Sequence, residues 1–179
     1  YKGDYRLILG PSGCGKTTLL NVLGGISSAT SGKILVPPPV NSQKAYKKYK
    51  NKNGNSRILR DIATFSSKEL TNYRRYEVGI IFQFYNLIPI LTALENVELT
   101  ARLANIKNPK TQALQILADL GLKDKINQYP SELSGGEQQR VAIARVLVKN
   151  PILILADEPT GNLDSKNSLE IYRTLKNIS

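Results

Sequence analysis

Residues Gly10-Pro11-Ser12-Gly13-Cys14-Gly15-Lys16-Thr17, close to the start of the sequence, constrain the fold of this chain more than any other feature. They fit the pattern G-x-x-x-x-G-K-[ST] without deviation. Glycines let the backbone curl so that successive N–H groups face one anion, and a following helix adds its positive N-terminal end. The apolar segment Tyr5–Leu9 before the pattern is expected to be a strand, and a helix is expected from Lys16 to about Gly24. The pattern therefore predicts a phosphate-binding loop between a strand and a helix.

Chemical roles follow from the residue types in this loop. The Lys16 ammonium is placed to reach the β- and γ-phosphates of a nucleotide, and the Thr17 hydroxyl is placed to ligate Mg²⁺. We expect all eight residues of the pattern, together with Thr18, to contact ATP. A glycine turn that only joins a strand to a helix is the alternative, and the complete match to the pattern disfavours it.

Two acidic residues follow the apolar run Ile152–Ala156, which is too short for a helix and is predicted to be a fully buried strand. Asp157 is expected to hold Mg²⁺ through water. Glu158 is expected to orient the attacking water and accept its proton. Two acids after a strand can also start a loop or cap a helix. The phosphate loop in the same chain favours the catalytic interpretation.

A second helix start suited to an anion lies in the string Leu133-Ser134-Gly135-Gly136-Glu137-Gln138-Gln139-Arg140. Apolar residues recur at helical spacing after it, on the side of Val141, Ala144 and Val148. An ordinary serine N-cap with a glutamate at the third helical position, the capping box, is the alternative interpretation.

The hydrophobic pattern places the remaining elements. Strands are expected over Lys33–Val36 and Glu77–Phe82, and a short helix from Ser67. A helix is expected from about Thr92 to Leu120, with Leu94, Val97 and Ala101 on one face, and Ala113, Leu114, Leu117 and Leu120 on another. A last helix over residues 165–178 carries Leu169, Tyr172 and Leu175 at helical spacing. Strand–loop–helix units around a helical middle predict an α/β domain with a mainly parallel sheet and an inserted helical subdomain.

The net charge of +11 is concentrated between Pro37 and Arg60, where seven basic residues occur without an acid. Three prolines open this stretch, and Asn, Gln, Ser and Gly dominate the rest, so it is predicted to be an exposed, flexible insertion. We favour a solvated loop. A surface for anionic lipid headgroups or an acidic partner, and a nucleic-acid contact, stay open as alternatives.

The composition, 41% hydrophobic and 22% charged, is typical of a globular domain. No apolar run is long enough to cross a bilayer, no secretory leader is visible, and the single Cys14 suits a reducing compartment. The sequence lacks methionine and histidine. We therefore expect a protein of a reducing compartment such as the cytosol, and a sequence that is incomplete at both ends.

The string from Leu133 to Arg140 resembles the signature motif of the ABC (ATP-binding cassette) family. Three further strings, residues 81–89, 94–99 and 157–164, are similar to the lipoprotein-release and macrolide-exporter branch of that family. The resemblance covers nearly everything except residues 37–60. It implies a single ABC ATPase domain over 1–179, with a P-loop NTPase (RecA-like) core at 1–36, 61–83 and 150–179. Residues 37–60 are then the basic flexible insertion, and residues 84–149 the helical subdomain with the signature motif.

The resemblance also assigns roles to single residues. Gln83 matches the Q-loop glutamine, which contacts Mg²⁺ and the reacting water and links catalysis to the membrane subunit. Residues 161–164 match the D-loop, with Asp164 as the aspartate that communicates across a dimer. Ser134, Gly135 and Gly136 would cap the γ-phosphate of ATP held by the phosphate loop of a second domain, paired head to tail. The family's switch histidine and adenine-stacking aromatic would lie outside this chain.

The function that the resemblance implies is the ATP-binding and hydrolysing subunit of an ABC transport system, of export or lipoprotein-release type. It would couple ATP-driven dimer closure to an integral membrane permease, separate or fused, and would thus be a peripheral protein on the cytoplasmic side of the cell membrane. A soluble ABC-type ATPase that acts on DNA or ribosomes is the alternative, which would use the basic insertion for phosphate contacts. A module that binds nucleotide without hydrolysing it is a third reading, disfavoured by the presence of Lys16, Asp157 and Glu158.

Overall fold

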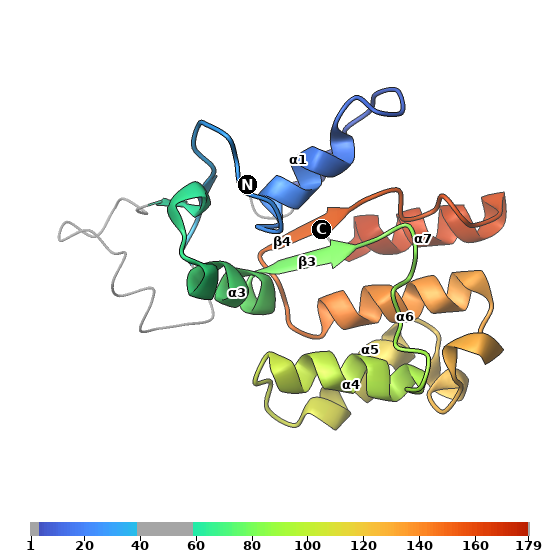
Figure 1. Ribbon diagram of the computed structural model, residues 1–179. Coiled ribbons are helices and arrows are strands. Elements are labelled where there is room, and N and C mark those ends of the chain that lie inside the picture. The colour runs from blue at the N-terminus through green and yellow to red at the C-terminus, as the bar shows by residue number, and fades with distance from the viewer. Residues whose placement is uncertain (1–3, 39–58, 179) are drawn as a thin grey trace.

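The computed structural model describes residues 4–38 and 59–178, which form a small parallel sheet between layers of helices (Figure 1). The elements follow in the order α1 (Lys16–Leu23), β1 (Leu35–Val36), β2 (Arg60–Asp61), α3 (Ser67–Tyr76), β3 (Val78–Ile81), α4 (Ala93–Leu103), α5 (Pro109–Asp119), α6 (Gly135–Leu147), β4 (Leu153–Ala156) and α7 (Ser165–Ile178). Short 3₁₀ turns occur at Ile62–Thr64, Lys123–Lys125 and Pro130–Glu132. Within these described ranges, the helices are too short or too polar to traverse a bilayer.

Strands β3 and β4 pair in parallel, with Val78 opposite Leu153 and Ile81 opposite Ala156. Side chains alternate between the two faces of such a pair. One face meets a hydrophobic cluster that also contains residues from α1, β1 and α3, and it consists of Val78, Ile80, Leu153 and Leu155. The opposite face, formed by Ile81, Ile154 and Ala156, meets a cluster with α6 and α7. The sheet is therefore covered on both faces, as parallel sheets require.

Gly79 lies in β3 where helix α6 comes closest to the sheet. A Cβ built at Gly79 would lie 2.1 Å from Cγ1 of Val146, so that a side chain there would force its neighbours to shift. A glycine inside a strand often marks such a close approach. The glycine thus allows α6 to pack directly on the sheet.

The helical middle of the chain has its own core. Helices α4, α5 and α6 surround a cluster that includes Val97, Ala113, Leu117 and Val141, all fully buried. A capping box fixes the start of α4. The Thr92 side chain accepts a hydrogen bond from the Glu95 N–H, and the Glu95 carboxylate accepts one from the Thr92 N–H. The predicted helical subdomain is thus a packed unit, and α6 belongs to its core and to the sheet layer at once.

Strands β1 and β2 form a two-residue antiparallel ladder that joins the ends of the basic stretch. Arg60 of β2 is buried there and forms an ion pair with the carboxylate of Glu77, while its guanidinium also donates to the Pro37 carbonyl at 2.7 Å. Arg60 therefore departs from the expectation that the whole stretch is solvated, because a distant glutamate neutralises it inside the protein. The central part of the insertion, residues 39–58, lies outside the described residues.

The helix predictions are confirmed for α1, α3, α6 and α7, and the strand predictions for β3, for β4 and, over its last two residues, for β1. The prediction of one helix from Thr92 to Leu120 is wrong, because the chain turns between α4 and α5, where Asn105 and Asn108 have positive φ values. The predicted strand Tyr5–Leu9 is wrong in this structure, since the segment forms no strand and Leu9 is 82% exposed. The expectation that β4 is fully buried is also wrong. Only Leu155 is buried, because β4 has a single parallel neighbour among the described strands.

Candidate functional site

The predicted phosphate loop curls around the side chain of its own lysine. The Nζ of Lys16 donates to the carbonyl of Gly10 at 2.8 Å and to that of Pro11 at 3.0 Å. Gly13 and Gly15 adopt φ values of 80° and 97°, which glycine reaches without strain. These two glycines turn the chain, and the ammonium group joins the two ends of the turn.

Helix α1 follows this loop with an open N-terminus. Its N-cap is Gly15, so no side chain caps the first N–H groups, and its first turn carries no acid. By contrast, a glutamate closes a capping box at the start of α3, α4 and α6. Uncapped N–H groups and the positive helix end favour an anion at this position. With the Lys16 ammonium beside them, the residues present fit the triphosphate of ATP.

The carboxyl ends of β3 and β4 bring the second group of predicted residues together. The N–H of Asp157 donates to the Ile81 carbonyl at 2.9 Å, which extends the ladder to the end of β4. Gln83 follows β3 by two residues, and its carbonyl accepts from the side chain of Asn162 at 3.1 Å. Figure 1 shows the loop before α1 on the same side of the molecule as these strand ends. Ligands of open parallel sheets bind at that edge.

Gly161 approaches the Gln83 side chain so closely that a built Cβ would lie 2.7 Å from its Nε2. We call residues 83–86 the Q-loop and residues 161–164 the D-loop. The two loops are in direct contact through this glycine and through the Asn162 bond. The structure thus joins two motifs that stand 78 positions apart in the numbering.

Glu158 begins a turn that leads into the D-loop. Its φ is 45°, in the left-handed region that residues other than glycine rarely adopt, and its carbonyl accepts from the Gly161 N–H at 3.0 Å. Its side chain is exposed. Strained backbone of this kind is concentrated at functional sites in proteins.

The predicted magnesium ligands are one hydroxyl, one amide and one carboxylate, on Thr17, Gln83 and Asp157. Within the described ranges, no three Cys, Asp or Glu side chains gather as a metal site. Magnesium prefers oxygen ligands and is commonly held by one carboxylate together with substrate phosphates and water. These three residues fit that kind of site, in which the nucleotide supplies part of the coordination.

Ser134 begins α6 with the geometry of a capping box, as the alternative interpretation of its motif predicts. Its side chain accepts from the Glu137 N–H at 3.3 Å, and the Glu137 carboxylate accepts from the Ser134 N–H at 2.8 Å. That backbone hydrogen bond, more than the neighbouring Lys125, lowers the pKa of Glu137. A nucleotide contact by Ser134 stays a prediction.

Both glycines of this motif lie close against side chains from other parts of the chain. A built Cβ at Gly135 would lie 2.8 Å from the Tyr85 hydroxyl, and one at Gly136 would lie 2.5 Å from Oδ1 of Asn167. Asn167 in turn bonds through its N–H and side chain to the carboxylate of Asp164, the D-loop aspartate. The sequence missed Tyr85 and Asn167 as contacts of the motif, since nothing in the local pattern relates them to it.

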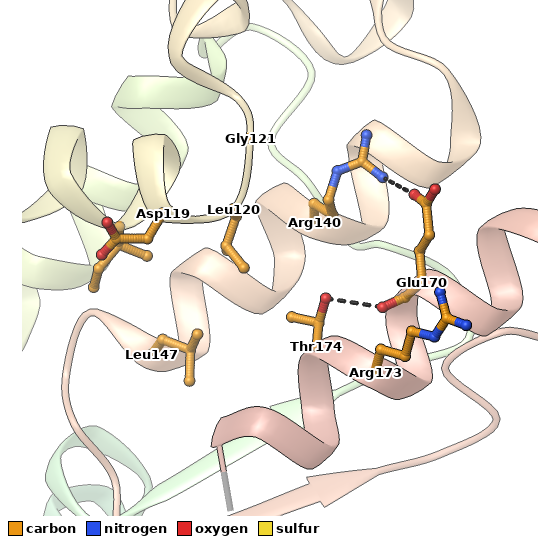
Figure 2. Close-up of a pocket in the computed structure, with 9 residues that line it drawn as sticks. Asp119, Leu120, Gly121, Arg140, Leu147, Glu170, Arg173 and Thr174 are labelled. Atoms are coloured by element: carbon orange, nitrogen blue, oxygen red, sulfur yellow. Dashed lines mark hydrogen bonds and ion pairs between the residues drawn. The ribbon is translucent and has the colours of Figure 1, made fainter.

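A separate groove of about 660 Å³ lies between α5, α6 and α7, and Figure 2 shows eight of its lining residues labelled. The Arg140 guanidinium points to the Glu170 carboxylate there, at 3.5 Å. The groove shares no residue with the predicted nucleotide site. The groove therefore does not support the predicted ATP site.

The fold and the phosphate loop together define a nucleotide-binding α/β domain of the P-loop NTPase class. The ABC transporter family matches residues 1–161. An uncharacterized ABC transporter ATP-binding protein of Thermotoga maritima is 41% identical, over 99% of this chain and 68% of that protein. The lipoprotein-releasing system ATP-binding protein LolD 2 of Chlorobium chlorochromatii is 43% identical, over 100% of this chain and 68% of that protein.

Solved structures agree with the sequence comparisons. The ATP-binding cassette MJ0796, determined as a dimer in a post-hydrolysis state with ADP and Pi, has a TM-score of 0.75 and 38% identity, over 98% of this chain and 69% of that one. The chain therefore belongs to the ABC transporter family, as an ATP-binding domain with ATPase activity. This confirms the fold class and the resemblance to the lipoprotein-release branch.

Proposed function

We propose that this chain powers an ABC transport system of export or lipoprotein-release type, by binding and hydrolysing ATP between two copies of the domain. The observation that carries the proposal is the loop around Lys16, whose ammonium lies next to the uncapped start of α1. The LolD relatives support the lipoprotein-release type. The export type rests on the similarity of the three motif strings.

The residues divide the chemistry among them. The N–H groups of the Gly10–Thr17 loop and the Lys16 ammonium hold the phosphates. Thr17, Asp157 and Gln83 hold Mg²⁺, which supplies positive charge against the phosphate oxygens when it is bound. Glu158 orients the attacking water and accepts its proton.

The second copy completes the site. Ser134, Gly135 and Gly136 of one domain face the phosphate loop of the other, so that each nucleotide is held by two chains. The D-loop with Asp164 lies at the same junction, since Asn167 connects Asp164 to Gly136 within one chain. The dimeric state of MJ0796 supports this arrangement.

A membrane permease subunit is the proposed second partner, which makes the protein peripheral at the cytoplasmic face. Exposed apolar side chains in and after the Q-loop support a docking surface there, since Phe84 is 69% exposed and Ile90 is 81% exposed. On this proposal, 1–36, 61–83 and 150–179 are the ATPase core, and 84–149 is the subdomain that meets the membrane partner. Residues 37–60 are the insertion, whose buried end Arg60 belongs to the core.

The substitution Glu158→Gln in the complete protein tests the chemistry. We expect ATP hydrolysis to fall by about 100-fold or more, because a general base is lost, while ATP binding is kept. A stable ATP-bound dimer should then accumulate in size-exclusion chromatography. Asp124→Asn, which removes an exposed acid on a 3₁₀ turn of the helical subdomain, serves as the control and should leave turnover unchanged. Full turnover by Glu158→Gln would remove that residue from its proposed role.

The transport role is tested by capture of partners from membranes and from nucleic acid. The proposal expects co-purification with an integral membrane protein. Salt-sensitive capture of DNA or ribosomes, without a membrane partner, would instead support the soluble ATPase.

A further inference from the structure

Gln139 lies in the second turn of α6 and is fully buried. Within residues 4–38 and 59–178, neither its amide nitrogen nor its amide oxygen has a hydrogen-bond partner. Buried polar groups in folded proteins are nearly always bonded, and a buried amide without a partner is costly. A methionine of similar length would fill the position without that cost. The polar group at Gln139 is therefore unexplained by the packing of the domain.

Helical spacing places Gln139 on the face of α6 that meets the two loops. Residues three or four apart share a face, so Gln139 lies between Gly135, one turn before, and Ile143, one turn after. Ile143 packs in the cluster that contains Leu163 of the D-loop. A Cβ at Gly135 would meet both Leu163 and the Tyr85 hydroxyl of the Q-loop. Gln139 thus lies on the side of α6 that faces both loops.

Those loops contain backbone groups that can become its partners. The Q-loop and the D-loop are bonded to each other through Asn162 and the Gln83 carbonyl, at 3.1 Å. Neither loop belongs to a strand or helix, so their N–H and C=O groups are not committed to a regular ladder. A small movement of the joined loops against α6 can bring such a group within reach of the Gln139 amide.

We infer that Gln139 is a positioning residue for the ATPase reaction, which holds the joined Q- and D-loops when Ser134 engages nucleotide in the partner domain. This inference rests on the proposed function. Ser134 caps the helix that carries Gln139, so contact at Ser134 shifts the amide against the loops. The amide gains its hydrogen bond in the closed dimer and thereby fixes Gln83 at the reacting phosphate. In the single domain the Gln139 amide lacks hydrogen-bond partners, which costs free energy. Because the closed state removes this cost, the amide favours closure.

The test compares Gln139→Met with the parent in the complete protein. We expect kcat to fall about three- to tenfold, the worth of one hydrogen bond, while the KM for ATP changes less than about twofold. The melting temperature should rise by about 2–4 °C, because an unsatisfied amide is removed from the core. A residue that only supports the fold would not combine higher stability with lower kcat.

Gln128→Met is the matched control. Gln128 also has a buried amide oxygen without a partner in the described chain, and its backbone carbonyl accepts from Ala93 in the helical subdomain. This variant should leave kcat unchanged. An unchanged kcat in Gln139→Met, or a fall in its melting temperature, would overturn the inference. A parent that neither binds nor hydrolyses ATP would overturn the proposed function as well, so the two failures are distinguishable.

Discussion

Replacement of Glu77 by leucine should destabilise the domain more than most single changes. Glu77 and Arg60 are each 8% exposed and share a two-pronged ion pair, with one hydrogen bond of 3.1 Å. Removing the carboxylate leaves a buried guanidinium, which costs about 3–5 kcal/mol in such pairs. The Pro37 carbonyl and the face of the Phe65 ring, 5.5 Å from the guanidinium carbon, still contact the cation. We therefore expect the low end of that range, about 3 kcal/mol.

Thermal and urea unfolding of the complete protein measure this cost. About 3 kcal/mol corresponds to a melting temperature lower by about 6–12 °C for a domain of this size. The double variant Arg60→Met with Glu77→Leu removes both charges and should recover most of the loss, because an apolar pair can replace a buried ion pair. A single variant within about 1 kcal/mol of the parent would refute the reasoning. So would a double variant no more stable than Glu77→Leu.

Three further predictions concern other parts of the structure. Lys16→Met should weaken ATP binding at least about tenfold, measured by calorimetry, since the only ammonium in the loop is lost; unaltered affinity would contradict the assigned site. Gly79→Ala should lower the free energy of unfolding by about 1–3 kcal/mol through overpacking against Val146, and Val146→Ala in the same chain should restore part of it; an undiminished stability would contradict the close contact. Burial, with a neighbouring guanidinium as the smaller cause, lowers the pKa of Lys149 to about 8 from 10.5. The unfolded chain then binds the extra proton between about pH 8 and 10.5, so the stability that Lys149→Met gains over the parent should shrink as pH rises through that window; a gain independent of pH would contradict this.

The sequence predicted those parts of the fold that local pattern controls. The helix that ends near Gly24, the capping box at Ser134, and the strand before Gln83 all carry their signals within a few residues. The last helix shows the limit. Its spacing allowed a stripe through Leu169 and Tyr172, yet both are exposed, while Ile171 and Leu175 are buried. When a helix has two candidate apolar stripes, the elements that pack against it decide which of the two is buried.

Long-range pairing explains the other differences. Arg60 looked like one more charge of a basic stretch because its partner Glu77 lies 17 residues away and only the fold brings them together. The contact of Tyr85 with Gly135 has the same origin. At the site, the motifs predicted which residues matter. They could not predict that the Q-loop and the D-loop would be joined through Gly161, since this depends on the pairing of β3 with β4.

The short β1–β2 ladder has a practical consequence for engineering. It holds Val36 beside Arg60, so the two positions that flank residues 37–59 lie next to each other. Adding residues to a segment closed in this way costs little, about 0.6 kcal/mol for each doubling of its length. A fluorescent reporter or an immobilisation tag can therefore be grafted between these two positions, leaving the phosphate loop, which belongs to another part of the domain, undisturbed.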